Sequence, residues 1–317
     1  MNQTKEPIQE FIIVGFPGFQ DKNSRSMLFC VLLTVYILIL LANALIVITI
    51  MCDESLQSPM YILFYCLAVI DTFISTTTVP KLLEVLSSSR SSISITACFV
   101  QMFSYHTFSN AESILLGLMA YDRYLAICRP LHYYTNTSNS LVIKQIICCW
   151  ICAVMILIVP IILVIRLQFC DQNKLVHFFC DYSAVLKLAC SDTLLISYVG
   201  LGFGLSALVI PLIYILYSYS RIIHSVLKIT KVDGRLKAFS TCSTHLMIIS
   251  VFYIVGAGVF ISNRIPGTSI DMRIMIGLVQ NLFPPVMNPI IYCLRSKEIR
   301  ESFVKTLKKN RIFPKRN

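Results

Sequence analysis

Among the polar side chains within the long apolar stretches of this sequence are Asp71, Glu112 and Asn288. A polar group within a membrane-spanning segment is costly and usually faces the protein interior, where it marks a functional site. Two carboxylates in one dry site repel each other, so either one of them is protonated or a cation lies between them. These residues therefore predict a buried polar centre that holds either a cation or a shared proton.

An acidic and a basic residue, Asp122 and Arg123, are adjacent near the end of the third apolar stretch. At a membrane edge such a pair forms an ordinary interfacial ion pair, or the long arginine extends toward an aqueous cavity. The sequence has no HExxH pattern, and Cys149 and Cys152 lie inside an apolar stretch without histidines at zinc-binding spacing. We therefore expect neither an enzyme nor a zinc site.

Seven apolar segments must position these side chains. The 317 residues are 56% hydrophobic and only 14% charged, which is far more apolar than a typical soluble protein. A helix needs about 20 mostly apolar residues to cross a bilayer, whereas the strands of a membrane barrel would alternate apolar and polar residues over short segments. The expected fold is an all-α bundle with seven membrane helices at residues 27–51, 59–86, 97–127, 141–165, 194–222, 238–262 and 272–294.

Basic residues set the expected orientation of the chain. Of the 27 lysines and arginines, 17 lie around the connections between helices three and four and helices five and six, and in the C-terminal segment. The positive-inside rule then places the C-terminus in the cytoplasm and the N-terminus outside. We expect a single domain with an outer segment at 1–26, the seven helices within 27–294 and a cytoplasmic tail at 295–317. Membrane topology thus explains the net charge of +11, and we expect no nucleic acid partner.

The outer segments are short. Neither the N-terminal segment nor the longest outer connection, residues 166–193, is large enough for a separate ligand-binding domain, so a small ligand must enter the bundle from outside. Residues 296–309 place apolar side chains at helical spacing opposite lysines and arginines, which favours an amphipathic helix on the inner leaflet. Prolines within the helices are expected to bend them: Pro80, Pro160, Pro211 and Pro289.

Four of the 13 cysteines are expected on the outer side, where disulfides form: Cys98, Cys170, Cys180 and Cys190. Four cysteines allow three pairings, and spacing alone does not choose among them. Sequons begin at Asn2 and Asn136, but only Asn2 lies outside in this topology, so it is the expected glycosylation site.

Five motifs, in order along the chain, resemble those of one family. Met119 to Tyr133 reads MAYDRYLAICRPLHY, which is similar to the hallmark of odorant receptors at the inner end of the third helix. The other four motifs are PMYILFYCLAVID from Pro59, SYSRI from Ser218, KAFSTCSTHL from Lys237 and PPVMNPIIYCLRSKEIRESF from Pro284. The chain therefore resembles an odorant receptor of the rhodopsin-like, G-protein-coupled family over nearly its whole length.

The resemblance implies a plasma-membrane receptor, located in the cilia of olfactory sensory neurons, that binds a small odorant. Ligand binding would favour a state in which the sixth helix swings outward and a heterotrimeric G protein of the olfactory stimulatory type binds, which raises cyclic AMP. The resemblance assigns this step to Asp122, Arg123, Tyr219, Lys237 and Tyr292. A receptor of the same scaffold for a metabolite or peptide is the alternative, and a transporter is disfavoured because inverted repeats are absent from the sequence.

The expected odorant pocket lies among the outer halves of the helices. Helical spacing from Cys98 places five side chains on the pocket side of the third helix, and these are Met102, Tyr105, His106, Ser109 and Asn110. The resemblance adds Phe203, Ala207, Tyr253, Gly256, Ala257 and Phe260. His106 and Asn110 are candidates to anchor a polar group of the ligand, although a lone histidine in a helix is more often structural. Ile254 replaces a glycine of the family pattern and is expected to reshape the pocket floor.

The resemblance also refines two expectations from the residues. It implies that Cys98 pairs with Cys180 and Cys170 with Cys190. It likens the positions of Asp71, Glu112 and Asn288 to a sodium site, with a proton-sharing network as the alternative, and it implies no other cofactor.

Overall fold

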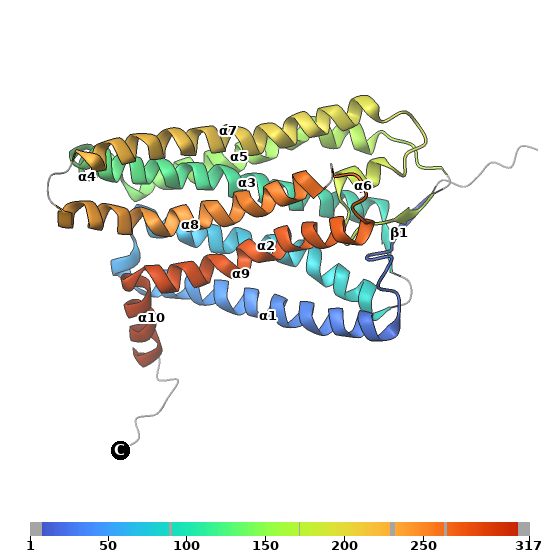
Figure 1. Ribbon diagram of the computed structural model, residues 1–317, viewed down its shortest axis with the longest axis horizontal. Helices are drawn as coiled ribbons and strands as arrows, with labels where there is room; N and C mark the ends of the chain where they lie inside the picture. Colours follow the sequence, from blue (N-terminus) through green and yellow to red (C-terminus); the bar gives the residue numbers. More distant parts are fainter. Residues whose placement is uncertain (1–7, 89–90, 171, 229–231, 263–264, 310–317) are drawn as a thin grey trace, which may run out of the picture.

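A computed structural model describes residues 8–88, 91–170, 172–228, 232–262 and 265–309, and the side chains at 134, 136, 232–241, 260 and 306–309 lie outside this description. Seven long helices run side by side (Figure 1). Each contains one of the predicted apolar stretches, so the prediction of the helices is confirmed. They are α1 Lys22–Cys52, α2 Pro59–Ser87, α3 Ile95–Cys128, α5 Asn139–Ile165, α7 Leu194–Leu227, α8 Val232–Ser262 and α9 Ile270–Arg295.

Side-chain caps and prolines explain where several helices begin and how they run. The side chains of Ser94, Ser138 and Ser269 accept hydrogen bonds from backbone N–H groups in the first turns of α3, α5 and α9. Helix α2 begins with a proline after Ser58. A proline is tolerated there because the backbone N–H of the first helical residue makes no hydrogen bond within the helix. The prolines predicted inside helices, and two more in α9, lie within α2, α5, α7 and α9.

Six of the seven long helices are long and apolar enough to cross a membrane, and α3 is the exception. Helix α3 spans 34 residues but carries polar side chains along much of its length. Its neighbours account for this polarity, because α3 lies against α2, α5, α7 and α8. A helix that other helices enclose does not need an apolar surface on every side.

The outward faces of the bundle consist of large apolar side chains. Leu41 on α1, Ile151 on α5 and Ile210 on α7 are 58%, 58% and 65% exposed. Such a surface suits lipid rather than water. Ile254 is 70% exposed on α8, so its side chain belongs to this outward surface. The expectation that Ile254 reshapes a pocket floor was therefore wrong.

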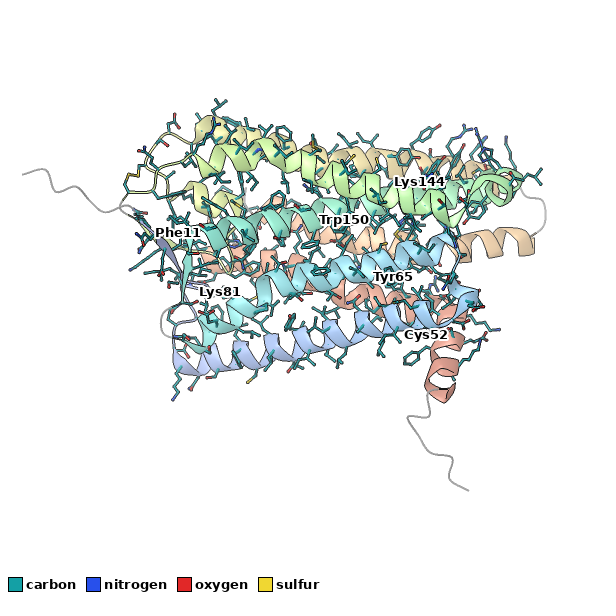
Figure 2. All side chains as sticks on the ribbon, turned by 180° about the vertical axis from the view of Figure 1, so that it is seen from behind. Phe11, Cys52, Tyr65, Lys81, Lys144 and Trp150 are labelled. Carbon is teal, nitrogen blue, oxygen red and sulfur yellow. A yellow bond between two sulfur atoms is a disulfide. The ribbon has the colours of Figure 1, made fainter. Side chains whose placement is uncertain are left out.

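One end of the bundle carries a small sheet that the sequence did not predict. We call it the sheet end, and it comprises β1 Glu10–Ile13, β2 Ser92–Ser94, β3 Lys174–Leu175 and the short helix α6 Tyr182–Leu186. Strand β1 lies in the middle, antiparallel to β2 and parallel to β3. Figure 2 shows Phe11 of β1 at this end and Cys52 of α1 at the other. The N-terminal segment thereby ties together the connections after α2 and α5.

Buried aromatic packing and a close backbone contact hold the N-terminal segment in place. Phe11 is fully buried, and its ring meets that of Phe169 edge to face at 5.1 Å. The backbone N–H of Gly18 donates to both carboxylate oxygens of Asp271 at 3.0 and 3.1 Å. A Cβ at position 18 would lie 2.5 Å from Asp271 Oδ2, so the carboxylate would have to move and these hydrogen bonds would change.

The opposite end, which we call the tail end, comprises the short helices η1 Glu54–Leu56 and α4 Pro130–Asn136 and the terminal helix α10 Lys297–Lys309 (Figure 1). Helix α10 is the predicted amphipathic segment. It is tied to the α1–α2 connection because Lys305 lies 3.5 Å from Asp53. The hydroxyls of Ser302 and Ser55 and the charge of Lys305 lower the pKa of Asp53 to about 2, so Asp53 is ionised at neutral pH.

Replacing Phe11 with alanine should lower the free energy of unfolding by about 3 kcal/mol, because a fully buried aromatic ring is lost and a cavity remains. Phe73→Ala is the matched control, since Phe73 is 48% exposed on α2 and should cost less than half as much. Thermal unfolding of the purified protein in detergent measures both changes. Equal losses of stability for the two variants would contradict a packed sheet end.

Candidate functional site

The three polar residues predicted to form a buried centre lie on α2, α3 and α9. Asp71, Glu112 and Asn288 are 0%, 4% and 1% exposed. The amide of Asn288 donates to Asp71 Oδ2 at 2.9 Å. Asp71 Oδ1 and Asn288 Oδ1 are buried without a hydrogen-bond partner in the described part of the chain. The centre therefore has oxygen atoms available for a further ligand.

Further amides and hydroxyls extend this centre toward α1 and along α9. The amide of Asn43 donates to the carbonyl oxygens of Ile39 and Pro285, each at 3.0 Å. The hydroxyl of Thr78 donates to Asn281 Oδ1 at 2.9 Å. These bonds join α1, α2 and α9 around the polar centre.

Tyr292, which the resemblance assigned to activation, lies on α9 near this centre. It is fully buried, and its ring lies 4.3 Å from that of Phe64 on α2. Its hydroxyl has no hydrogen-bond partner among the described residues. Packing thus holds the side chain in place. Its hydroxyl is available to form a hydrogen bond if the helices rearrange.

At the tail end of α3, Asp122 and Arg123 form a buried ion pair. Arg123 Nη2 and Nε lie 2.5 and 3.1 Å from Asp122 Oδ2. Arg123 is 9% exposed and Asp122 is 4% exposed. The other carboxylate oxygen accepts a hydrogen bond of 3.1 Å from the hydroxyl of Tyr133 on α4. Separating the two side chains while they stay buried would leave each charge unpaired, so this arrangement of the helices favours the intact ion pair. The sequence predicted the pair but not Tyr133.

A second contact at the tail end links α7 to α8. The Tyr219 hydroxyl and His245 Nδ1 share a hydrogen bond of 2.8 Å, and both residues are buried. Sequence reasoning singled out Tyr219 and missed His245, although this histidine stands in the motif KAFSTCSTHL. Lys237, also predicted for this step, lies in α8 with its side chain outside the described residues.

In the sheet-end half of the bundle, the structure brings several predicted ligand residues together. Met102 is fully buried beside the Cys98–Cys180 bridge. The ring of Tyr105 lies 4.5 Å from that of Phe179 and 5.2 Å from that of His106.

Two polar side chains on this part of α3 have unpaired nitrogens. His106 Nε2 and Asn110 Nδ2 are both buried and make no hydrogen bond in the described part of the chain. His106 Nε2 lies 3.9 Å from the carboxylate of Asp181. Both residues thus offer hydrogen-bonding capacity to a molecule between the helices.

Helices α3, α7 and α8 meet one turn deeper. The hydroxyl of Ser113 donates to the carbonyl of Ala207 at 2.9 Å and lies 3.4 Å from the hydroxyl of Tyr253. Tyr253 in turn donates to the carbonyl of Leu208 at 3.2 Å. Two predicted residues, Ala207 and Tyr253, therefore lie at one junction, whose third member, Ser113, the sequence reasoning missed.

The remaining predicted ligand residues are less closely connected. Gly256 lies beside Gln280 of α9, whose amide nitrogen would be 3.6 Å from an added Cβ. Ser109 and Phe203 are partly buried, and Ala257 is exposed. The side chain of Phe260 and the sequon at Asn2 lie outside the described residues.

An aromatic segment between β3 and α6 covers this region, and the sequence reasoning did not select it. Phe178 and Phe179 are 1% and 2% exposed, and the rings of His177 and Phe179 lie 4.9 Å apart. Burial lowers the pKa of His177. Burial alone would raise the pKa of Asp181, but His177 and His106 outweigh it and lower that pKa. The run HFFCD in the sequence was the available signal.

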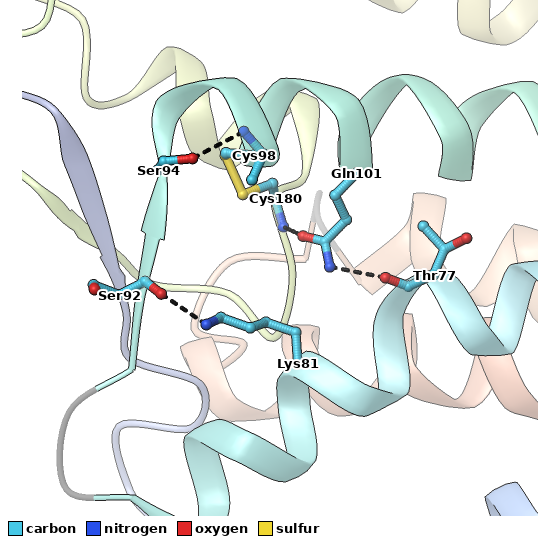
Figure 3. Close-up of a disulfide and its surroundings, with 8 residues drawn as sticks. Thr77, Lys81, Ser92, Ser94, Cys98, Gln101 and Cys180 are labelled. Carbon is cyan, nitrogen blue, oxygen red and sulfur yellow. Dashed lines mark hydrogen bonds between the residues drawn. A yellow bond between two sulfur atoms is a disulfide. The ribbon is translucent and has the colours of Figure 1, made fainter.

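Two disulfides hold the sheet end. Cys98 is bonded to Cys180 and Cys170 to Cys190, with Cα atoms 5.4 and 5.8 Å apart. Figure 3 shows Gln101 beside the first bridge, where its amide donates to the carbonyl of Thr77 at 2.8 Å and accepts from the backbone N–H of Cys180 at 3.0 Å. The aromatic segment is thereby fixed to α3 by a covalent bond and by a hydrogen bond to Gln101, which in turn bonds to α2.

These arrangements suit binding and conformational change rather than covalent chemistry. Within the described residues, no group of three or more His, Cys, Asp or Glu side chains is placed to hold a metal ion. The sheet end offers apolar surface with a few unpaired polar atoms, which is typical of sites for small molecules. The tail end offers breakable polar contacts between helices.

Comparisons with known proteins agree with this arrangement. The family model described as olfactory receptor matches residues 29–310. Olfactory receptor 1468 of Rattus norvegicus is 35% identical over 311 residues, which cover 98% of each chain. Olfactory receptor 10A3 of Homo sapiens is 34% identical over 311 residues, again 98% of each chain, and Olfactory receptor 1E1 of Homo sapiens is 35% identical over 313 residues, 99% of each chain. With its multi-pass helical bundle, the chain therefore belongs to the olfactory receptor family of seven-helix G-protein-coupled receptors.

Proposed function

We propose that this protein is an odorant receptor of the plasma membrane that binds a small odorant among the sheet-end halves of its helices. Binding activates a heterotrimeric G protein of the olfactory stimulatory type at the tail end and so raises cyclic AMP. The receptor acts in the cilia of olfactory sensory neurons. The buried Asp122–Arg123 pair with its contact to Tyr133 is the observation that supports this proposal most directly.

The sheet end faces outside and the tail end faces the cytoplasm in this proposal. Both disulfides lie at the sheet end, and disulfides persist in oxidising compartments. The tail end carries the basic connections and α10, as the positive-inside rule requires of a cytoplasmic face. Glycosylation of Asn2 stays a prediction of this orientation.

The odorant binds beneath the aromatic segment that carries Phe179, between α3, α7 and α8. Tyr105 and Phe179 supply apolar surface, while His106 Nε2 and Asn110 Nδ2 supply unpaired polar atoms. An uncharged ligand with one polar group matches this lining, because each buried polar atom without a partner raises the free energy of the empty site. A ligand with a charged amine would need an acidic partner. Asp181 is the acid beside this site, but it already interacts with His106 and His177 and is less available to such a ligand.

The ligand acts on the tail end by shifting the population of helix arrangements. In the present arrangement Asp122 holds Arg123, and His245 holds Tyr219 between α7 and α8. Outward movement of α8 would break the second contact and leave Arg123 and Tyr219 free to line a cavity for the G protein. The cost of breaking a few such contacts, about 1 kcal/mol each, is within what a bound odorant supplies.

Arg123→Ala should abolish the cyclic AMP response while leaving surface expression mostly intact. A panel of odorants is applied to cells that express the receptor with the olfactory stimulatory G protein, and cyclic AMP is measured against surface label. Arg129→Ala is the matched control, because Arg129 is an exposed arginine just beyond α3. An undiminished response of the Arg123 variant would refute the assigned role.

His245→Leu should raise the basal cyclic AMP level. The substitution leaves the buried Tyr219 hydroxyl unpaired in the resting arrangement, which costs about 1 kcal/mol and shifts the equilibrium about fivefold toward the alternative. His224→Leu, at an exposed position in the last turn of α7, should leave the basal level unchanged. Basal signalling at or below the unmodified level would show that the Tyr219–His245 contact does not restrain α8.

The polar centre fits a sodium ion, because sodium prefers oxygen ligands and Asp71 Oδ1 and Asn288 Oδ1 are buried without partners. Asp71, Glu112 and Asn288 would hold the ion, whose charge would offset the repulsion between the two carboxylates. A shared proton is the alternative occupant.

Sodium chloride should stabilise the purified receptor against thermal unfolding more than choline chloride does at equal ionic strength, as expected for a ligand of the folded state. Asp71→Asn should remove the difference, whereas Asp53→Asn, which removes an acid at the tail end, should retain it. If neither salt nor substitution makes a difference, the centre holds a proton instead.

A further inference from the structure

A short strap of the N-terminal segment, residues 14–20, follows strand β1 at the sheet end. The backbone N–H groups of Val14 and Gly15 donate to the carbonyl oxygens of Leu175 and His177 at 2.9 and 3.2 Å. Leu175 belongs to β3 and His177 to the aromatic segment above the proposed odorant site. One end of the strap is therefore hydrogen-bonded to that segment.

The strap and the aromatic segment, residues 176–181, are packed together and form what we call the cover. Phe16 of the strap is 1% exposed and belongs to one apolar cluster with Phe178 and Phe179 and with side chains of α1, α2 and α9. The ring of Phe179 lies 4.5 Å from that of Tyr105. The cover thus rests on a residue of the proposed odorant site, and burial of Phe16 favours the closed arrangement.

The other end of the strap is held to α9 by a contact that water can reach. The N–H of Gly18 donates to both carboxylate oxygens of Asp271, the second residue of α9, at 3.0 and 3.1 Å. Gly18 is exposed and Asp271 is partly exposed. Because water competes for the same donor and acceptors, this contact opens at little cost and without unfolding of the bundle.

The opposite side of the cover is held much more firmly. Cys180 follows Phe179 directly and is bonded to Cys98 on α3, and its N–H donates to Gln101 (Figure 3). A disulfide does not open on the timescale of helix and loop movements. The cover is therefore hinged at α3 and released on the side of α9. Helix α9 lies against α8, which borders the proposed odorant site, so an opening on this side leads to that site.

We propose that the contact between Gly18 and Asp271 is a latch on the entry route of the ligand. When the latch breaks, the cover moves away from α9 and a small molecule passes between the water outside and the site among α3, α7 and α8. Asp271 is then a positioning residue, which controls ligand exchange without touching the ligand. The identity of the ligand as an odorant rests on the proposed function, whereas the opening of the cover does not.

Opening of the cover is measured by the rate at which a charged methanethiosulfonate reagent modifies a thiol beneath it. Asn110→Cys introduces this thiol in the full-length receptor on intact cells, one helical turn beyond His106. A charged reagent does not cross the bilayer, so it reaches position 110 from outside. Mass spectrometry of the labelled peptide gives the rate. Gln9→Cys, at an exposed position of the sheet end, gives the reference rate for a thiol outside the cover.

Asp271→Ala should raise the rate at position 110 about threefold to tenfold, because loss of the latch increases the population of the open cover. Gly18→Ala should have a similar effect, since its Cβ would lie 2.5 Å from Asp271 Oδ2. The double variant should react no faster than either single variant, because both substitutions remove the same contact. Asp271→Asn keeps one acceptor oxygen and should give an intermediate rate.

Two matched controls should leave the rate unchanged. Glu10→Ala removes an exposed acid from β1 at the same end of the bundle, and Gly202→Ala adds a methyl group where nothing lies within 4 Å. An unchanged rate in Asp271→Ala would overturn the latch, and so would effects that multiply in the double variant. An equal rise in Glu10→Ala would also overturn it, because loss of an acid would then be the cause.

Labelling and signalling separate this inference from the proposed function. The expected rise in labelling without any cyclic AMP response to the odorant panel would retain the latch and overturn the proposed function. Unchanged labelling together with a cyclic AMP response that Arg123→Ala abolishes would overturn the latch and retain the proposed function.

Discussion

Lipid around the bundle leaves polar side chains a single favourable direction, which is inward. No water in the hydrocarbon layer can satisfy an exposed polar group, so Asp71, Glu112 and Asn288 are almost fully buried while Ile210 and Ile254 face outward. The outward surface is thereby apolar, unlike that of a soluble protein, while the mainly apolar interior also holds these polar groups. The other features of the receptor follow from where these inward groups meet.

Helix α3 is where most of them meet. It is too polar to qualify as a membrane helix on its own, yet it lies against four other long helices, and its polarity is useful only because they enclose it. Along α3, His106 and Asn110 lie toward the sheet end, Glu112 lies at the polar centre, and Asp122 and Arg123 lie at the tail end. The proposed odorant site, the proposed sodium site and the Asp122–Arg123 pair therefore each include residues of α3, and in the proposed mechanism a ligand at one end influences contacts at the other through this helix.

The sequence predicted features that arise from local pattern and missed those that depend on distant partners. Apolar runs gave the seven helices, and helical spacing of apolar residues gave α10. The sheet was missed because its strands have two to four residues and come from segments more than 70 residues apart, too short for a detectable alternation. Tyr133 and His245 were missed because their roles arise from Asp122 and Tyr219 on other helices. Ile254 was assigned to the pocket from its place in a motif, which does not determine the direction of a side chain.

The two ends of the bundle are held by interactions of different kinds, and in the proposed mechanism this difference determines where the receptor moves. At the sheet end, two disulfides, a three-stranded sheet and the buried Phe11 join the connections after α2 and α5 to the top of α3. At the tail end, the described hydrogen bonds between helices include that of Tyr219 with His245, between α7 and α8, and that of Asp122 with Tyr133, between α3 and α4. A covalent bond does not open on the timescale of signalling, whereas a hydrogen bond that contributes about 1 kcal/mol does. In the proposed mechanism, a small change in packing under the aromatic segment is therefore released as helix movement at the tail end, where the described contacts between helices are not covalent.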